Sequence, residues 1–448
     1  MHDTPLIGPY NPDDVLAWEQ GGPRTARQFL ADVSRLVESL PDRPTVLNLA
    51  TSRYEFLVGF AAAILRRQVT LLPQSRAPQT LRRVAGDYPD SYGLTDRDDT
   101  IEGIESVSIQ PLRGRTAWPR EIPRVPLNQL VAIAFTSGST GQPMPNKKTW
   151  GALTAVAHAT GARLGIKGGD RAAVVATVPH QHMFGLEASV MLPVMHGLVM
   201  HAGRPLFPAD IRSALADVTG QRILVTTPLH LRACVTEGVR VPSGGLILSA
   251  TAPLSRSLAQ EAERHFQTKV HEIFGFAEAG SVAERRTVDG ERWRPLDGVR
   301  VVQDEASWMV HAEYLPAPVP VPDRITVDAQ GTFVVHGREA DQVNVAGHRV
   351  SLGDLNQKLL EIDGVQDGVF FLPEEGSDLV TRLMAFVVAP RKTSEEIQRA
   401  LRTHIDPVFL PRPLVCVPSL PRNETGKLPR EAVSELARRW LERQGHGA

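Results

Sequence analysis

Short apolar runs alternate with apolar or amphipathic stretches of helical length along most of this chain. The runs at 45–49, 69–72, 172–178 and 222–226 have the length and composition of buried strands, and residues 56–65 predict a buried helix between the first two. Alternating strands and helices favour a parallel, doubly wound α/β architecture. Ligands in that architecture bind beyond the carboxyl ends of the strands, so the loops after the apolar runs are candidate sites.

The regular alternation stops near residue 340. Four prolines between residues 316 and 322 interrupt regular structure, and shorter elements follow Gly337-Arg338. We therefore expect a large N-terminal domain over residues 1–339 and a compact α+β domain over residues 340–448, which is a normal domain size.

Composition excludes several classes of protein. The 49 basic and 50 acidic side chains leave a net charge of −1, whereas a general nucleic-acid binder needs a basic excess. Cys234 and Cys416 are far apart, which argues against a disulfide framework or a cysteine metal site and suits a reducing cytoplasm. The longest apolar stretch, 56–65, is too short to span a bilayer, and no signal peptide is evident. We expect a cytoplasmic protein with no membrane or nucleic-acid partner.

A loop rich in glycine and hydroxyl side chains follows the apolar run 131–134. Its residues are Thr136, Ser137, Gly138, Ser139, Thr140 and Gly141. Backbone N–H groups and hydroxyls in such a loop can surround an anion, and glycines let the main chain approach closely. The Walker spacing is absent, so we interpret the segment as a different kind of polyphosphate loop. Ordinary turn chemistry is the alternative.

Lys427 follows Gly426 in a segment bounded by Pro421 and Pro429. This pattern predicts a stiff loop that leaves the lysine ammonium free to reach a reacting anion and neutralise its charge. A solvated surface lysine is the alternative.

Glu278 lies at the end of an apolar segment that includes Phe274, Gly275 and Phe276. A carboxylate in such surroundings is either costly or paired, and Mg²⁺ that bridges phosphate oxygens would be a suitable partner. A structural ion pair explains the carboxylate equally well. Each phenylalanine can pack in the core or stack on a base.

Asp323 and Arg338 flank a segment whose turn at 327–331 predicts a tight hairpin. Hairpin pairing would bring both residues to one end of the ribbon, where the carboxylate can accept ribose hydroxyls. A salt bridge at a domain junction is the alternative.

His182 follows a strand end and can form the wall of a substrate pocket. His180 and His182 could be two ligands of a zinc ion, but no third ligand lies at a spacing that would complete such a site.

Taken in this order, these segments resemble the AMP-forming acyl/aryl synthetase superfamily. The superfamily contains acyl-CoA synthetases, adenylation domains of peptide synthetases, and luciferases. The resemblance covers nearly the whole chain and rests on the 136–143 loop, residues 274–278, residues 337–349 and Gly426-Lys427. It implies a large N-terminal domain with doubly wound sheets and a small, mobile C-terminal domain. It also implies an enzyme that uses ATP and Mg²⁺ to convert a carboxylic acid to an acyl-adenylate with release of pyrophosphate.

The resemblance implies a role for each matched residue. Residues 136–141 would hold the β- and γ-phosphates of ATP, Asp323 the ribose and Glu278 the Mg²⁺. Lys427 matches the lysine that bridges the substrate carboxylate and the α-phosphate, and His182 matches the residue that gates the acyl pocket. Gly347 would approach the incoming thiol after the C-terminal domain rotates. The remaining matches contact the nucleotide, and they are Thr251, Ala252, Pro253, Phe274, Gly275, Phe276 and Arg338.

The chain departs from the superfamily pattern at three places. Met144-Pro145 replaces a usual Lys-Gly, which leaves Lys147 or Lys148 as possible substitutes. Ala277 replaces a threonine, and Ala340 replaces an Asp or Lys at the hinge. The chain is also shorter than typical members. These differences affect the expected rates and the domain rotation more than the reaction class.

The chain is similar to ligases that load aryl or short acyl groups in bacterial polyene-pigment clusters. This similarity favours a hydroxybenzoate as the acid and the phosphopantetheine of an acyl carrier protein as the acceptor. His182, Phe184 and Gly275 would line the acid pocket. Arginines at 430, 438, 439 and 443 form either a docking face for an acidic carrier or a solvated helix surface.

Three alternatives remain open. Coenzyme A is the alternative acceptor, on a short or medium acyl or aryl acid. A non-catalytic nucleotide-binding module would keep the phosphate loop, but it would not need Lys427 and Glu278. A luciferase-like oxygenase would share the adenylation step, although nothing in the sequence indicates oxygen chemistry.

Overall fold

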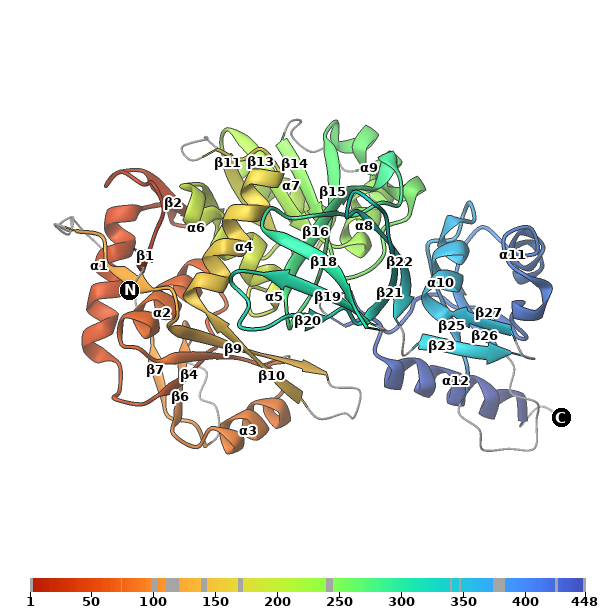
Figure 1. Ribbon diagram of the computed structural model, residues 1–448, viewed down its shortest axis with the longest axis horizontal. Coiled ribbons are helices and arrows are strands. Elements are labelled where there is room, and N and C mark those ends of the chain that lie inside the picture. Colours follow the sequence, from red (N-terminus) through yellow and green to blue (C-terminus); the bar gives the residue numbers. More distant parts are fainter. Residues whose placement is uncertain are drawn as a thin grey trace.

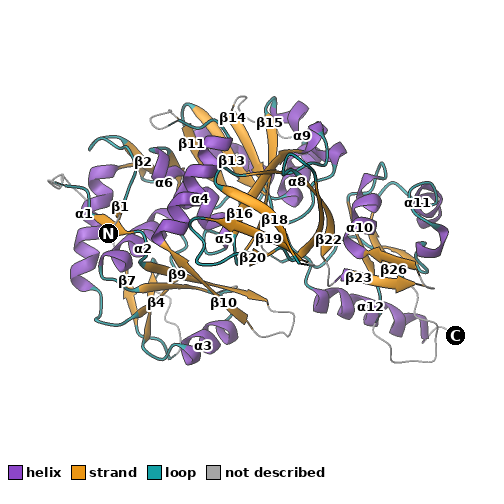
Figure 2. Cartoon of the chain, in the orientation of Figure 1, coloured by secondary structure: helices purple, strands orange, loops and turns teal. Residues whose placement is uncertain are grey.

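The fold consists of a large lobe built on two sheets and a smaller lobe formed by the C-terminal part of the chain (Figure 1). The computed structural model describes residues 3–73, 75–97, 103–109, 121–137, 143–167, 172–238, 245–305, 307–338, 341–345, 348–373, 383–423 and 426–445. Helices pack against the sheets in both lobes (Figure 2).

The first sheet of the large lobe has the strand order β10-β9-β5-β4-β6-β7. Neighbouring strands from β9 to β7 are parallel, whereas β10 is the antiparallel partner of β9 at one edge. The bounds are β4 (Thr45–Asn48), β5 (Val69–Leu72), β6 (Ser91–Thr95), β7 (Ser106–Ser108), β9 (Leu130–Ser137) and β10 (Pro143–Thr149). A separate short pair joins β1 (Asp3–Pro5) to β8 (Arg124–Pro126).

The second sheet has the order β17-β16-β15-β14-β13-β11-β12-β2-β3. Its central strands, from β15 to β2, are parallel, and both edges are antiparallel hairpins. The bounds are β2 (Val15–Glu19), β3 (Gly22–Thr25), β11 (Ala172–Ala176), β12 (Val199–His201), β13 (Gln221–Thr226), β14 (Gly245–Ser249), β15 (Lys269–Phe276), β16 (Gly280–Arg286) and β17 (Arg294–Pro295). The expected doubly wound α/β architecture is confirmed, with antiparallel edge hairpins that the alternation did not indicate.

Helices fill the space between the sheets and cover their outer faces. Between the sheets lie α1 (Ala26–Ser39), α2 (Arg53–Leu65), α4 (Trp150–Arg163), α5 (Met183–Leu186), the π-helical turn η1 (Glu187–Met191) and α6 (Leu192–His196). The outer faces carry α3 (Pro78–Asp87), α7 (Pro208–Asp217), α8 (Pro228–Glu237) and α9 (Arg256–Phe266). Thr25 and Gln28 form the predicted capping box at the start of α1. The predicted helix at 56–65 is α2, and it is buried on all sides because it lies between the two sheets.

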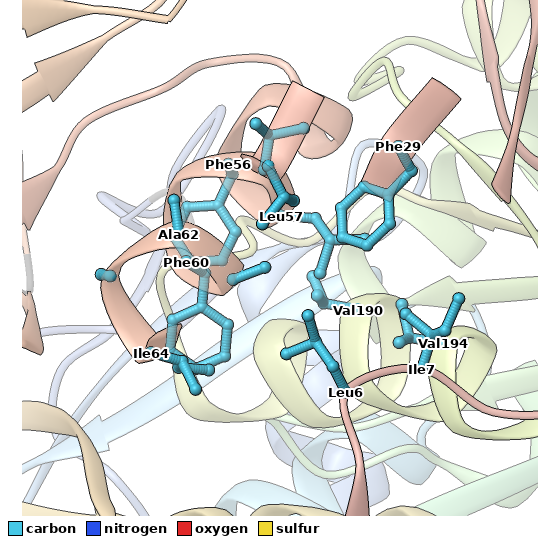
Figure 3. Close-up of a cluster of buried hydrophobic side chains, with 14 of the residues drawn as sticks. Leu6, Ile7, Phe29, Phe56, Leu57, Phe60, Ala62, Ile64, Val190 and Val194 are labelled. Carbon is cyan, nitrogen blue, oxygen red and sulfur yellow. The ribbon is translucent and has the colours of Figure 1, made fainter. Parts of the chain in front are cut away.

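The main core joins α1, α2 and the η1–α6 segment (Figure 3). Phe29 on α1 and Phe56 on α2 are fully buried there, and Leu6 from the N-terminal segment packs on the same cluster. Burying a side chain of this size contributes about 1.5–3 kcal/mol. Because these side chains come from elements far apart in sequence, the core fixes the relative positions of the two sheets.

The last strands of the large lobe lead into the small lobe. A small sheet comprises β18 (Val299–Asp304), β19 (Ser307–Ala312) and β20 (Val319–Pro320), and a hairpin comprises β21 (Asp323–Val327) and β22 (Phe333–Arg338). The small lobe contains β23 (Gln342–Val345), β24 (His348–Ser351), α10 (Leu352–Glu361), β25 (Asp367–Phe371), β26 (Met384–Val388), α11 (Ser394–Leu401), β27 (Leu414–Cys416) and α12 (Arg430–Gly445). Two short 3₁₀ turns, η2 (Thr287–Asp289) and η4 (Pro407–Phe409), complete the elements named here.

The small lobe has its own hydrophobic core. Two buried clusters lie wholly after residue 342, one around Phe370 and Leu359 and the other around Phe386 and Val433. Residues 339 and 340 lie outside the described part of the chain, so the division into 1–339 and 340–448 stays a prediction. None of the helices in the described ranges is long and apolar enough to cross a membrane.

Candidate active site

One large cleft lies between the carboxyl ends of the strands of the large lobe and the facing loops of the small lobe. Its volume is about 2750 Å³, which exceeds the roughly 300–1,000 Å³ of an ordinary ligand pocket. Both lobes contribute to its walls. Among the residues predicted from the sequence, those that line it are His182, Phe184, Thr251, Ala252, Pro253, Phe274, Gly275, Phe276, Glu278, Asp323 and Lys427. The tertiary structure thus brings together segments that are up to 245 positions apart in the chain (427 − 182).

The loop Thr251-Ala252-Pro253 follows β14, as expected for a ligand loop in this architecture. Thr251 has a φ of +79°, a conformation that is strained for a β-branched residue. Buried Glu272 holds the far end of the loop, because its Oε1 accepts a hydrogen bond of 3.0 Å from the backbone N–H of Leu254. Its Oε2 accepts from Arg285 Nε at 2.8 Å, so the carboxylate is paired as well as buried.

The two phenylalanines at the end of β15 pack against a buried cluster and also line the cleft. Phe274 packs against Trp293 and Phe333, each with a ring-centroid distance of 5.5 Å, which supports the core interpretation for this residue. Phe276 makes an edge contact with Phe274 at 6.3 Å. Gly275 is exposed to the cleft, and a Cβ added there would lie 2.4 Å from the carbonyl oxygen of Gly280. Gly275 therefore permits the close pairing of β15 with β16 beside the cleft.

The hairpin β21–β22 confirms the predicted pairing of Asp323 with Arg338. The two residues are register partners at the open end of the ribbon. Next to them Gly337 has a φ of +96°, and a Cβ there would lie 2.3 Å from Ser351 Oγ, which caps α10 of the small lobe. Glycine at this position therefore lets β22 pass close to the start of α10.

Glu278 differs from the expectation. The sequence placed this carboxylate in apolar surroundings where it would be costly or paired, but its side chain is exposed to the cleft. That inference was wrong because the chain turns at residues 277–279 and carries Glu278 out of the β15–β16 pair. Its backbone carbonyl accepts a hydrogen bond of 3.0 Å from Lys148 Nζ. An exposed carboxylate at the cleft wall fits Mg²⁺, which takes few protein carboxylates and binds substrate phosphates as well.

His182 and Phe184 lie where the pocket wall was predicted. His182 is the N-cap residue of α5, and both side chains are half-buried and line the cleft. His180 is fully buried instead, and its Nε2 lies 3.0 Å from the carbonyl oxygen of Ala50. The described residues contain no group of three or more His, Cys, Asp or Glu side chains placed to hold a metal ion. The two histidines therefore do not form a zinc site within the described structure.

The loop that carries Lys427 is held by a set of hydrogen bonds. Two hydrogen bonds join Asn423 and Lys427. The backbone N–H of Asn423 donates to the carbonyl oxygen of Lys427 at 2.8 Å, and the backbone N–H of Lys427 donates to Asn423 Oδ1 at 2.9 Å. Arg422 Nη1 donates to Gly426 O at 2.7 Å, and the same guanidinium pairs with both oxygens of Asp367 at 2.6 and 2.7 Å. These hydrogen bonds support the expectation of a stiff loop, which stays a prediction because residues 424 and 425 lie outside the described part of the chain. The Lys427 side chain is exposed and lines the cleft.

The same loop touches the large lobe. Gly426 is buried with a φ of +77°, and a Cβ there would lie 3.4 Å from Thr227 Oγ1. Thr227 belongs to a small polar cluster in which its Oγ1 lies 2.9 Å from His230 Nδ1. Burial, reinforced by the positive charge of Arg204, lowers the pKa of His230 to about 4. The small lobe therefore docks against a neutral histidine and buried hydroxyl groups.

Parts of the predicted site lie outside the described residues. Thr136 and Ser137 end β9, and β10 resumes at Pro143, so the phosphate-loop residues Gly138, Ser139, Thr140 and Gly141 are not described. The same is true of Gly347. Their proposed roles stay predictions, as does the nucleotide contact of Arg338.

The arginine cluster near the C-terminus is partly paired along α12. Arg438 pairs with Glu435 and Glu442, and Arg439 pairs with Glu435. These acidic partners reduce the positive charge that a docking face would need, which favours the solvated-surface alternative.

Sequence reasoning missed Glu187, a buried carboxylate that feels the charge of buried Lys148. Lys148 is 4% exposed and Glu187 is 5% exposed, and Glu187 lines the cleft. Burial lowers the pKa of Lys148, while the charges of Glu187 and Glu278 act in the opposite direction. A glutamate inside an otherwise apolar helical segment is the signal that could have identified Glu187.

Comparison with known proteins agrees with this geometry. The family described as AMP-binding enzyme matches residues 50–315, and the family described as AMP-binding enzyme C-terminal domain matches residues 357–427. The chain is 28% identical over 275 residues to the 4-coumarate–CoA ligase of Rhodobacter capsulatus, covering 61% of this chain and 67% of that relative.

Solved structures share the fold over nearly the whole chain. ATP-bound MatB from Rhodopseudomonas palustris has a TM-score of 0.80 at 17% identity, with 95% of this chain and 96% of that chain covered. The anthranilate CoA ligase AuaEII in complex with anthranoyl-AMP has a TM-score of 0.77 at 16% identity, with 95% and 94% covered.

Proposed function

The chain belongs to the AMP-binding enzyme family and is an AMP-forming acid–thiol ligase, and from this premise we propose that it activates an aromatic acid and transfers it to a phosphopantetheine thiol. The observation that carries the proposal is the docking of the Gly426-Lys427 loop at Thr227. In that arrangement Lys427 lines the same cleft as Asp323 and the loop Thr251-Ala252-Pro253, which are expected to bind the nucleotide.

The proposed reaction requires two anions to meet. A substrate carboxylate attacks the α-phosphorus of ATP, so charge neutralisation and in-line positioning are the main tasks of the protein. Lys427 would supply a cation between the two anions, and Asp323 would hold the ribose. The loop at 136–141 would hold the β- and γ-phosphates. Mg²⁺ held by Glu278 would add further positive charge at the phosphates.

The proposed acid is a hydroxybenzoate. His182, Phe184 and Gly275 all line the cleft, and an aromatic ring suits a pocket bounded by half-buried aromatic side chains. The named relative, a 4-coumarate–CoA ligase, also acts on an aromatic acid by its name.

The proposed acceptor is a phosphopantetheine thiol, a group that coenzyme A and acyl carrier proteins share. The relative's name supports coenzyme A. The carrier protein remains the other source of the same thiol, although the pairing of Arg438 and Arg439 leaves less charge for docking an acidic partner.

The experiment is a scan of pyrophosphate release from ATP over benzoates and fatty acids, followed by mass spectrometry of the product. We expect acid-dependent pyrophosphate with hydroxybenzoates, and a thioester on either coenzyme A or a holo carrier protein supplied separately. Pyrophosphate release that does not depend on any acid would contradict the proposal. Release with acid but no thioester on either acceptor would limit the activity to adenylation.

A further inference from the structure

Glu187 is a buried carboxylate that faces the cleft beside the predicted acid pocket. It begins the π-helical turn η1 directly after α5, the helix that carries Phe184 and is capped by His182. The side chain is 5% exposed, yet it contributes to the wall of the cleft. Nothing in the adenylation step assigns it a task.

The two oxygens of Glu187 have different surroundings. Oε2 accepts hydrogen bonds from Ser281 N at 3.0 Å and from Ser281 Oγ at 2.6 Å. Oε1 lies next to Gly280, where an added Cβ would be only 2.6 Å away. Within the described ranges no hydrogen bond to Oε1 is seen, and Gly280 has no side chain to cover this oxygen. Gly280 and Ser281 also line the cleft.

The charge of Glu187 is balanced from within the protein. Burial raises the pKa of Glu187, whereas the hydrogen bonds from Ser281 and the charge of Lys148, which is nearly as buried, act in the opposite direction. Lys148 Nζ is held by the carbonyl oxygen of Glu278 at 3.0 Å. A ligand at Oε1 therefore need not supply a positive charge, and an ammonium group would also meet the positive charge of Lys148.

A buried hydroxyl near Glu187 lacks a partner as well. Tyr314 Oη is buried, and no hydrogen bond to it is seen among the residues that the structure describes. Burial raises the pKa of Tyr314, and the charge of Glu187 raises it further, so the tyrosine lies within reach of that charge. Tyr314 is not part of the cleft wall, so its hydroxyl contributes to the polar surroundings of Glu187 and is not a contact for the ligand.

We propose that Glu187 selects the acid by accepting a hydrogen bond at Oε1 from a neutral hydroxyl or amino group that the acid carries in addition to its carboxylate. The inference rests on the proposed function and deepens it. The substrate class is then an acid with a neutral donor, such as a phenol or an arylamine. A methoxy group of similar size would bring a lone pair against the carboxylate and is rejected.

Glu187→Gln tests the inference. The glutamine side chain has the shape of glutamate, and its amide oxygen can still accept the hydrogen bonds from Ser281. Its amide NH₂ would then face the cleft in place of Oε1. The kcat/KM for acid-dependent pyrophosphate release is measured with hydroxy-, amino- and methoxybenzoates matched in ring position, and with benzoate. In the unmodified protein we expect the best donor-bearing acid to exceed its methoxy counterpart by about 10- to 100-fold. In Glu187→Gln we expect this ratio to fall at least tenfold.

A purely structural role for Glu187 predicts another outcome. If Glu187 only ties η1 to β16, then Glu187→Gln lowers activity on all acids alike and leaves the ratios unchanged, which would overturn the inference. Ser281→Ala provides a second variant, since it removes one donor to Oε2 and keeps the backbone donor. It should reduce the selectivity by a smaller factor while the protein stays folded by circular dichroism.

The two proposals fail in distinguishable ways. Equal activity of the unmodified protein on benzoate, methoxybenzoate and the donor-bearing acids would overturn the role of Glu187 and leave the ligase function in place. Absence of pyrophosphate release with every acid would overturn the proposed function, and the role of Glu187 with it.

Discussion

Lys427 is an exposed side chain on a fixed backbone. The hydrogen bonds between Asn423 and Lys427 hold the main chain, buried Gly426 rests against Thr227, and the Lys427 side chain lines the cleft. A cation presented this way needs little reorganisation when charge develops on a substrate, which is the condition for strong electrostatic catalysis.

We predict that Lys427→Ala reduces acid-dependent pyrophosphate release by about 100- to 1,000-fold, because one well-placed charged donor is lost. Transfer of the acyl group from a supplied acyl-adenylate to the thiol should be affected much less, since Lys427 is proposed to act only in adenylation. Pyrophosphate assays and thioester detection measure the two steps separately.

Lys269→Ala is the matched control, because Lys269 is an exposed lysine at the start of β15 and is not part of the cleft wall. It should leave both steps unchanged. An equal loss of both steps in Lys427→Ala would count against a separate arrangement of the lobes for thiol transfer.

At the scale of elements, an ion pair anchors the loop between β27 and α12 to the sheet of the small lobe. Arg422 and Asp367 are about one-sixth exposed, at 17% and 16%, and the guanidinium also bonds to Gly426 O. This bidentate pair links the Lys427 loop to β25, so the sheet of the small lobe determines where the lysine lies.

We predict that Arg422→Lys lowers the rate of adenylation by on the order of tenfold, because an ammonium cannot reproduce the fork and Lys427 becomes less well positioned. The decrease should appear in kcat for pyrophosphate release, with a small effect on the thermal midpoint. Arg438→Lys on α12 is the control, since the pairs of Arg438 are solvent-exposed and contribute little. If the two variants behave alike, Arg422 does not position Lys427.

At the scale of the whole molecule, stability depends on histidines that their surroundings keep neutral, one beside the contact between the lobes and one inside the large lobe. His230 lies beside Thr227, at the point where Gly426 docks, and its pKa is lowered to about 4 by burial and by Arg204. His180, which is fully buried, has a pKa lowered well below the ordinary value by burial and by Arg53. Both histidines are therefore neutral in the folded protein at neutral pH.

We predict that stability falls as the pH is lowered from about 6.5 towards 4. In this range the unfolded chain binds a proton at His230 and the folded chain does not, so acid favours unfolding. The contribution of His230 is fully present above pH 6.5 and is lost as the pH approaches 4. Its slope is at most about 1.4 kcal/mol per pH unit.

Urea denaturation followed by tryptophan fluorescence at a series of pH values measures this dependence. His230→Gln should make the midpoint less sensitive to pH between 6.5 and 4, whereas His404→Gln, at an exposed position of the small lobe, should not. An unchanged pH dependence in His230→Gln would show that the neutral state of His230 does not contribute to stability.

Much of the architecture could be predicted from local pattern. The predicted apolar runs correspond to β4, β5, β11 and β13, and the stretch at 56–65 corresponds to α2. These elements were predictable because a fully buried strand or helix consists of an apolar run of the matching length. The glycine turn at Gly426 and the pairing of Asp323 with Arg338 were also predictable, since turn chemistry and hairpin register are local properties.

Tertiary structure alone decided the rest. The apolar residues before Glu278 predicted a buried carboxylate, but the turn after β15 exposes it. Glu187 and Lys148 are both buried, although they lie 39 positions apart in the chain (187 − 148). Whether a charged side chain is buried or paired depends on which elements pack against it. The local sequence of one segment does not show which distant segments those are. The amino-acid pattern was enough to predict the main strands and helices, the family resemblance and the residue types suited to an ATP-dependent ligation. Only the folded structure decided which of those side chains share the cleft, because contacts between remote segments set their distances and their electrostatic surroundings.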